Sequence, residues 1–194
     1  MMDNLVKVMN KVYPSSARFF GKVGDKPDRL RPMFQYVKDN MQGGLVGVEV
    51  GVDRAVNARK VLDLMDIEML YLVDPYMPYE HHRTLEQQRE YKEQAKSYLS
   101  GYDDFINWLF YDSVSASIIL KDFVFDFVYI DANHDYSNVL NDCVRWFPLV
   151  KDGGVLGGHD FNGSHLDLQE AVHDFCEDND LRLFVKPDDW WVVK

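Results

Sequence analysis

Short runs of apolar residues alternate along this chain with longer segments in which apolar residues recur at helical spacing. A short apolar run bounded by turn residues is typical of a buried strand, and apolar positions three or four residues apart are typical of an amphipathic helix. The runs predict strands at residues 45–50, 68–73, 106–111, 125–130, 154–158, 181–186 and 190–194. The helical spacing predicts helices at residues 3–12, 28–42, 55–65, 80–99, 114–120, 136–150 and 166–177, with Ser164 as the cap of the last one.

This alternation predicts an α/β fold of the Rossmann-like, doubly wound type. Strands that are joined by helices run parallel and are covered on both faces. The last two strands are joined only by the turn Pro187-Asp188-Asp189, which is too short for a crossover helix, so these strands are expected to be antiparallel. We therefore expect a mostly parallel seven-stranded sheet with a C-terminal antiparallel hairpin and helices on both faces.

The length of 194 residues favours a single domain over residues 1–194. Within it, we expect residues 43–194 to form the core and residues 1–42 to form a helical cap segment at the N-terminus. Apolar residues make up 46% of the chain, which is enough to fill a core of this size.

The formal net charge of −11 bears on the partners of the protein. Nucleic acids and anionic membrane surfaces both require basic patches, so we expect neither as a partner. The N-terminus lacks the basic and apolar regions of a signal peptide, and no apolar run approaches 18 residues. Cys143 and Cys176 form no CxxC motif and are expected to be buried thiols. These features predict a soluble, cytoplasmic protein, and the acidity by itself does not indicate a substrate.

Acidic residues and a glycine stand at the ends of the predicted strands. Glu49 and Gly51 end the first strand, and Asp74 directly follows the second. Because parallel strands carry their ligands at the carboxyl edge of the sheet, a glycine turn at one tip and a carboxylate at the next are expected to hold a ribose-bearing cofactor. Asp112 and Asp131 occupy similar places after later strands, although an aspartate in such a place can also act as a helix cap.

Several of these segments together resemble the class I S-adenosylmethionine-dependent methyltransferases over roughly residues 40–194. The resemblance is closest to small O-methyltransferases whose fourth strand ends in Ile-Asp-x-x-His-x-Tyr. The segments that carry it are Val48-Glu49-Val50-Gly51, Leu72-Val73-Asp74, Tyr111-Asp112-Ser113, Ile130-Asp131-Ala132-Asn133-His134-Asp135-Tyr136, Gly153-Gly154 and Gly158-His159-Asp160.

The resemblance implies S-adenosylmethionine as cofactor and methylation of a small-molecule hydroxyl as the activity. Glu49 would lie near the ammonium group, Asp74 would accept from the ribose hydroxyls, and Asp112 would accept from the adenine amino group. The implied cofactor contacts are Glu49, Gly51, Val52, Asp53, Asp74, Pro75, Asp112, Ser113 and Asp131.

Two other functions stay open. One is a non-catalytic S-adenosylmethionine-binding protein of the same fold. The other is a nicotinamide-dependent oxidoreductase, which the sequence disfavours because the GxGxxG fingerprint is missing and Asp53 would repel a pyrophosphate.

The reacting end of the site is expected to hold Asp131, His134, His159 and Asp160. In one hypothesis Asp131, His159 and Asp160 bind Mg²⁺ or another divalent metal, which lowers the pKa of the acceptor hydroxyl. In the other, His134 or His159 is a general base and no metal binds. The candidate catalytic residues are thus Asp131, His134 and His159, and a purely structural role for His134 in its loop is a third alternative.

Residues farther along the chain receive structural interpretations. His165 and His173, on or near the helix at 166–177, are expected to be exposed. Trp190 and Trp191 are expected to pack in the sheet, and the sequence leaves open whether they also contribute to a homodimer.

Overall fold

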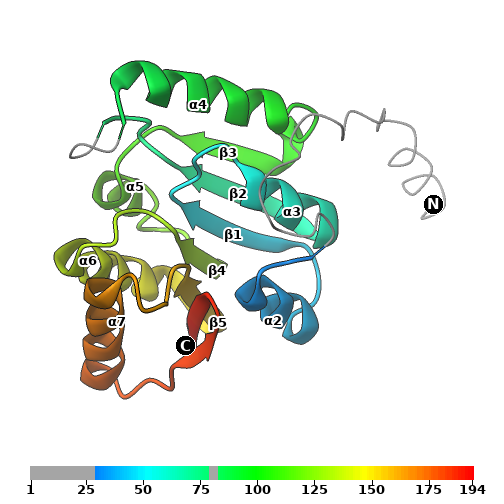
Figure 1. Ribbon diagram of the computed structural model, residues 1–194. Coiled ribbons are helices and arrows are strands. Elements are labelled where there is room, and N and C mark those ends of the chain that lie inside the picture. Colours follow the sequence, from blue (N-terminus) through cyan, green and yellow to red (C-terminus); the bar gives the residue numbers. More distant parts are fainter. Residues whose placement is uncertain (1–28, 79–82) are drawn as a thin grey trace.

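The part of the chain that the structure describes is a seven-stranded sheet covered by helices (Figure 1). The computed structural model describes residues 29–78 and 83–194. The strands are β1 (Leu45–Val50), β2 (Ile67–Val73), β3 (Ile106–Leu109), β4 (Phe125–Ile130), β5 (Val150–Gly158), β6 (Phe184–Lys186) and β7 (Asp189–Val193). The helices are α2 (Pro32–Asn40), α3 (Val56–Leu64), α4 (Leu85–Tyr98), α5 (Ser113–Ile119), α6 (Tyr136–Trp146) and α7 (Leu166–Asp178).

The sheet order is β3-β2-β1-β4-β5-β7-β6. The strands from β1 to β5 are parallel, and β7 runs antiparallel to both of its neighbours, β5 and β6. The order reverses between β1 and β4, and this reversal is the place where open α/β sheets bind their ligands. The predicted fold class, with its closing hairpin, is confirmed.

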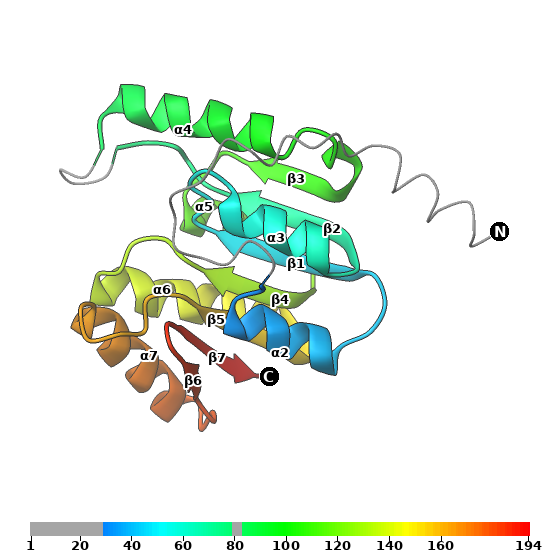
Figure 2. The same ribbon diagram turned by 45° about the vertical axis from the view of Figure 1, so that its right-hand side comes forward.

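Two apolar layers bury the two faces of the sheet. Helices α2 and α3 pack on one face together with the C-terminal end of α4, and helices α5, α6 and α7 pack on the other. In β4 every residue is buried, with Phe127 and Tyr129 on the first face and Val128 and Ile130 on the second. Burial on both faces explains why the central strands are continuous apolar runs in the sequence. Figure 2 shows α2 and α3 on the same side of the sheet.

Several predicted boundaries differ from the observed ones, and the differences around α6 and α7 have local reasons. Helix α6 stops at Trp146 and gives way to a 3-10 turn at Phe147–Leu149, because Pro148 has no N–H to continue the helical ladder. Val150, assigned to that helix by its apolar spacing, is instead the first residue of β5. Ser164 does not cap α7, because that helix begins after His165 and the Asn162 side chain organises the turn by accepting from the Ser164 N–H.

Some predictions lie outside the described residues. The helix expected at residues 3–12 lies entirely outside the described residues, and so does most of the cap segment expected at residues 1–42. Of that segment, the structure describes residues 29–42, which contain α2. Within residues 29–78 and 83–194, no helix is both long enough and apolar enough to cross a membrane.

Asp189 fixes α2 against the sheet. Its side chain is fully buried and accepts the backbone N–H of Met33, in the first turn of α2, at 2.9 Å. Its other oxygen accepts the hydroxyl of Tyr129, in β4, at 3.0 Å. One carboxylate at the start of β7 therefore joins α2 to the centre of the sheet, and it sets the position of Arg31 just before this helix.

Replacing Asp189 by alanine should leave two buried donors without a partner. We expect Asp189→Ala to lower the free energy of unfolding by about 1–3 kcal/mol. Asp152→Ala, at an exposed position in β5, is the control and should stay within about 0.5 kcal/mol of the parent. Urea unfolding measures both variants, and equal effects would contradict the role given to Asp189.

Candidate functional site

Four residues meet in one row at the carboxyl edge of the sheet. The pairing of β1 with β2 and β4, and of β4 with β5, ends in register. The next residue of each strand is Gly51, Asp74, Asp131 or His159. Backbone N–H groups of Gly51, Asp131 and His159 still donate to the neighbouring strand, at 2.9, 2.7 and 3.2 Å. The predicted meeting of strand ends is therefore present in the structure.

Gly51 is required by the close approach of two backbones. Its φ is +88°, and a Cβ atom built there would lie 2.0 Å from the carbonyl oxygen of Asp131. No other residue can occupy this position without moving one of the strands. The absence of a side chain thus keeps the loop after β1 close to the end of β4.

The carboxylate of Asp74 organises the same loop. Its Oδ2 accepts the backbone N–H groups of Val52 and Asp53, each at 3.0 Å, and its Oδ1 accepts the N–H of Tyr76 at 2.8 Å. Burial raises the pKa of Asp74, although these three hydrogen bonds oppose the rise. A carboxylate has about four acceptor sites, so Oδ1 keeps capacity for a further donor.

Glu49 is a buried acid with one free oxygen. Its side chain is 2% exposed, and its Oε1 accepts from the side-chain amide of Asn57 at 2.9 Å. Its Oε2 is buried without a hydrogen-bond partner in the described residues. Burial raises the pKa of Glu49 to about 8, against the hydrogen bond from Asn57. A cation placed beside this oxygen would favour the ionised carboxylate.

Arg31 belongs to the site, although no pattern in the sequence indicated it. Its Nη2 lies 3.8 Å from Oδ2 of Asp131, and its guanidinium carbon lies 5.9 Å from the centre of the Tyr129 ring. Its Nη1 is buried without a hydrogen-bond partner among the described residues. The residue stands in a segment whose spacing indicated only a helix, so its approach to Asp131 depends on the docking of α2.

At the end of β3, Asp112 and Ser113 are engaged within the protein. Asp112 caps α5 by accepting the N–H and the hydroxyl of Ser115, both at 2.8 Å, as the capping alternative predicted. The hydroxyl of Ser113 donates to Asp142 and accepts from the indole N–H of Trp146. Asp142, in α6, was missed by the sequence reasoning, and burial raises its pKa to about 6.

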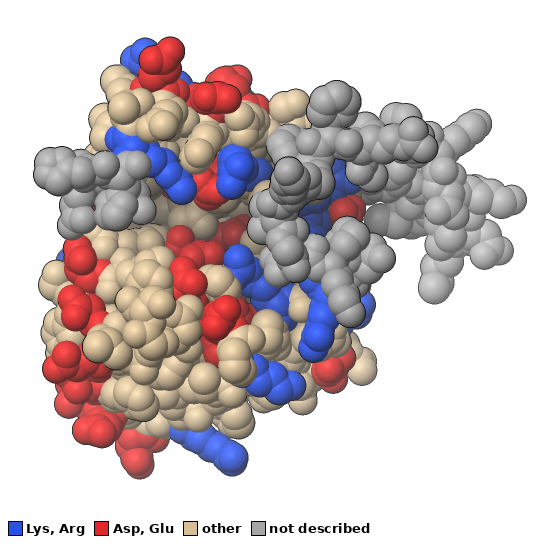
Figure 3. Space-filling model, in the orientation of Figure 1, with Lys and Arg blue, Asp and Glu red and all other residues tan. Residues whose placement is uncertain are grey.

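These groups line one cavity of about 710 Å³. Its wall contains every residue predicted as a cofactor, catalytic or metal-binding residue, and in addition Arg31, Asn57, Arg83, Asn141 and Asp142. In the face shown in Figure 3, acidic and basic side chains both border the hollow in the middle of the molecule. The predicted residues are Glu49, Gly51, Val52, Asp53, Asp74, Pro75, Asp112, Ser113, Asp131, His134, His159 and Asp160.

Asp53 and Arg83 close one side of the cavity. Nη1 of Arg83 lies 2.6 Å from Oδ1 of Asp53, and Nε of Arg54 lies 3.3 Å from its Oδ2. The Asp53 side chain is thus paired with two arginines, while its backbone N–H is held by Asp74.

The residues expected at the reacting end converge as predicted. Nδ1 of His159 lies 3.0 Å from Oδ1 of Asp160, and Nε2 of His134 lies 3.4 Å from Oδ2 of the same residue. Ligand atoms of Asp131, His159 and Asp160 all lie within 4.8 Å of one another. The geometry is compatible with either a carboxylate-oriented base or three ligands of a metal.

The surroundings shift the pKa values of Asp131, His159 and His134 in different directions. Burial raises the pKa of Asp131 to about 6, although Arg31 and His159 oppose this rise. Burial lowers the pKa of His159, but the carboxylates of Asp160 and Asp131 raise it and the net shift is upward. Burial lowers the pKa of His134, against the carboxylates of Asp160 and Asp135.

His165 lies beside the helix at 166–177, as expected, but the prediction that it is exposed was wrong. It directly precedes α7 and is only partly exposed, and its ring lies against that of His134 with centroids 4.5 Å apart. His173 lies within α7 and is exposed as expected. The spacing of apolar residues along α7 does not predict the contact between His165 and His134, because that contact depends on how α7 packs beside the loop after β4.

Comparison with known families gives one match. A family model described as a methyltransferase domain matches residues 45–161, which is more than half of the chain. No curated protein matches the sequence.

Three solved structures with the same fold are distant in sequence. A calicheamicin methyltransferase has a TM-score of 0.63 at 10% identity, and the match covers 83% of this chain and 77% of that one. The O-methyltransferase NovP has a TM-score of 0.55 at 17% identity, over 84% of this chain and 79% of NovP. MycE, from the mycinamycin biosynthetic pathway and in complex with Mg and SAH, has a TM-score of 0.58 at 16% identity, over 84% of this chain and 48% of MycE.

The raised pKa of Glu49 predicts a pH dependence of stability. Folded Glu49 keeps its proton up to a pH of about 8, whereas an unperturbed glutamate loses it near 4.5, so the free energy of unfolding should fall as pH rises between these values. The raised pKa values of Asp131 and Asp142 also lower the free energy of unfolding as pH rises, but only up to a pH of about 6. Glu49→Gln should therefore reduce the decline between pH 6 and 8, to which His159, whose pKa is also raised, contributes as well.

Urea unfolding at several pH values measures this decline. Glu68→Gln, at an exposed position in β2, is the matched control and should keep the decline of the parent. A Glu49→Gln variant that loses stability with pH as steeply as the parent would show that Glu49 is ionised in the folded protein.

Proposed function

We propose that this chain, which belongs to the class I S-adenosylmethionine-dependent methyltransferases, transfers the methyl group to an oxygen atom of a small acceptor. The observation that carries the proposal is the row of Gly51, Asp74 and Asp131 along one cavity at the point where the strand order reverses. NovP, a protein of the same fold, is an O-methyltransferase. The volume of the cavity lies in the range that holds a cofactor-sized ligand.

The residues at the end of β1 suit the amino acid part of the cofactor. Gly51 lets a ligand approach the backbone, because it has no side chain to block the way. The free Oε2 of Glu49 is a buried acceptor that an ammonium group would satisfy. We assign Glu49 as the partner of that group and Asn57 as the residue that holds Glu49 in place.

Asp74 suits the ribose. Its Oδ1 has the remaining acceptor capacity described above, and the strand row directs it into the cavity. Pro75, Val52 and Asp53 surround it in the cavity wall.

For the adenine end we propose the backbone of Ser113 together with Asp112 or Asp142. The carboxylate of Asp112 is exposed and caps α5, whereas Asp142 is buried in the wall. Either carboxylate could accept from an exocyclic amino group.

At the reacting end, the proposal assigns His159 as general base. When bound, S-adenosylmethionine supplies a methyl group on a sulfonium, which an acceptor oxygen attacks in line. His159 takes the proton from that oxygen, and Asp160 holds the imidazole by its Nδ1 so that Nε2 is free for the acceptor. Asp131 and Arg31 then border the acceptor.

Metal assistance at Asp131, His159 and Asp160 is the second form of the same proposal. Their ligand atoms are close enough to share an ion, and MycE contains Mg together with SAH. Such an ion would hold the acceptor oxygen and lower its pKa. Loss of turnover on treatment with EDTA, restored by Mg²⁺, would favour this form over a metal-free base.

The cofactor assignment predicts a selective loss of binding in Asp74→Asn. An amide presents a donor toward one of the backbone N–H groups and leaves one fewer acceptor for the ribose. We expect affinity for S-adenosylhomocysteine to fall at least tenfold, about 1.4 kcal/mol, by isothermal titration calorimetry.

Asp126→Asn is the matched control for this test. Asp126 also accepts a backbone N–H, from Val46 at 2.8 Å, but it does so at the opposite edge of the sheet. This variant should lose stability and keep its affinity. Equal affinities in the two variants, or parent protein that binds NADH instead of S-adenosylhomocysteine, would overturn the site assignment.

The assignment of His159 predicts a loss of turnover without a loss of cofactor affinity. Transfer of labelled methyl groups from S-adenosylmethionine to a panel of small hydroxylated compounds measures turnover. His159→Asn should be slower by about 10²–10⁴-fold on the best acceptor, while its affinity for S-adenosylhomocysteine stays within about twofold. An undiminished rate would remove His159 from the mechanism.

A further inference from the structure

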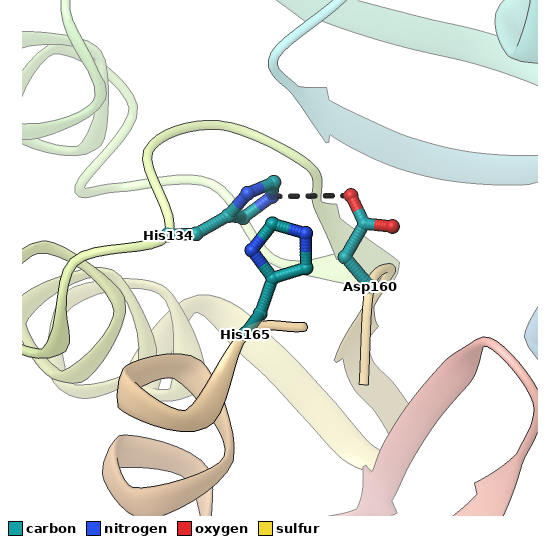
Figure 4. A group of neighbouring side chains, drawn as sticks. All are labelled: His134, Asp160 and His165. Atoms are coloured by element: carbon teal, nitrogen blue, oxygen red, sulfur yellow. Dashed lines mark ion pairs between the residues drawn. The ribbon is translucent and has the colours of Figure 1, made fainter. Parts of the chain in front are cut away.

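A second group of possible metal ligands lies on the other side of Asp160. It consists of His134 in the loop after β4, Asp160 in the loop after β5, and His165 directly before α7 (Figure 4). One ligand atom from each residue lies within 4.8 Å of the other two. Only Asp160 belongs also to the group formed with Asp131 and His159.

The separation of two of these atoms suits a shared ion. Nε2 of His134 lies 3.4 Å from Oδ2 of Asp160. Two ligands held tetrahedrally at about 2.0–2.2 Å from Zn²⁺ are about 3.4 Å apart. In Figure 4 the two imidazole rings lie beside each other, and Asp160 faces His134.

One buried nitrogen of this group has no hydrogen bond, although it lies 3.4 Å from Asp160 and 3.9 Å from Asp131. Nε2 of His134 is buried, and no hydrogen bond satisfies it in the described part of the chain. The ring of His165, which is partly exposed, packs against that of His134 with centroids 4.5 Å apart. Buried polar atoms are nearly always satisfied, so a ligand beside Nε2 of His134 would supply the interaction that this atom lacks.

The surrounding structure fixes the three segments relative to one another. The hydroxyl of Tyr136, at the start of α6, donates to Asp174 of α7 at 2.6 Å. The side chain of Gln169 donates to the carbonyl of Asn162 at 2.6 Å and so holds the loop between Asp160 and His165. Asp160 itself has a φ of +60°, a conformation that aspartate tolerates better than most residues.

We propose that His134, Asp160 and His165 bind a divalent transition-metal ion such as Zn²⁺, at the wall of the cavity. Two imidazole nitrogens and one carboxylate oxygen favour Zn²⁺, Fe²⁺, Co²⁺ or Ni²⁺ over Mg²⁺, which prefers oxygen ligands. Three protein ligands leave at least one coordination position open. Because His134 and Asp160 line the cavity, that position is directed toward the space where the proposed function puts the acceptor.

Asp160 would then link the ion to the proposed base. Its Oδ1 faces His159 and its Oδ2 faces His134, so the two roles use different oxygens of one carboxylate. This link rests on the proposed function, whereas binding of the ion itself does not.

Titration of the chelator-treated, full-length protein with Zn²⁺ tests the proposal. Calorimetry should show one site per chain, and His165→Asn and His134→Asn should each weaken binding at least tenfold. Mg²⁺ should not compete at a hundredfold excess. The matched control is His173→Asn, which changes an exposed histidine of α7, the helix that follows His165. This variant should bind Zn²⁺ like the parent.

Two further measurements separate the possible failures. The visible absorption of Co²⁺ in the parent protein should change on binding, and His165→Asn should abolish that change. Affinity for S-adenosylhomocysteine should be the same in His165→Asn as in the parent, which also shows that the variant is folded. If S-adenosylhomocysteine fails to bind the parent, the proposed function fails while the ion site stands.

Three results would overturn the ion site. They are the absence of Zn²⁺ binding to the parent, binding that His165→Asn leaves unchanged, and binding that is lost in His159→Asn but retained in His165→Asn. The last result would assign the ion to Asp131, His159 and Asp160 instead.

Discussion

The approach of the Gly51 backbone to the carbonyl of Asp131 is the contact on which the site depends. It is possible only because position 51 has no Cβ, which would lie 2.0 Å from that oxygen. With β1 and β4 this close, the loop after β1 passes over the sheet edge and Asp74 can hold its N–H groups. A wider spacing would separate the carboxylates and open the cavity to water. The absence of a side chain at Gly51 thereby permits the close approach of the ends of β1 and β4.

The carboxyl groups in the cavity have pKa values that are shifted in opposite directions. Glu49 is buried deepest and has its pKa raised to about 8, whereas the pKa of Asp160 is lowered by the adjacent His159 imidazole. Arg31 stands between these extremes and opposes the rise at both Glu49 and Asp131. The site can therefore hold neutral and ionised carboxyl groups side by side, which suits a cationic cofactor next to an acceptor that loses a proton.

The bounds of the two central strands, β1 and β4, were predicted better than those of most other elements. The bounds of β1 and β4 agree with the apolar runs residue for residue, because both strands are buried on both faces and every position contributes to the pattern. Helix ends depend on turn chemistry with a weaker signal, such as Pro148 after α6 and the Asn162 turn before α7. The same logic explains the site: residues at strand ends were found, and residues contributed by helices were not.

The sequence by itself determined the sheet, its closing hairpin and the row of strand-end residues, since the carboxyl ends of parallel strands necessarily share an edge. It also determined the family, because the motifs at those ends are local. Only the tertiary structure decided that Arg31, Asp142 and His165 join the site. Their positions follow from how α2, α6 and α7 pack on the sheet. That packing is a sum of many contacts between distant segments, which periodicity along the chain does not encode.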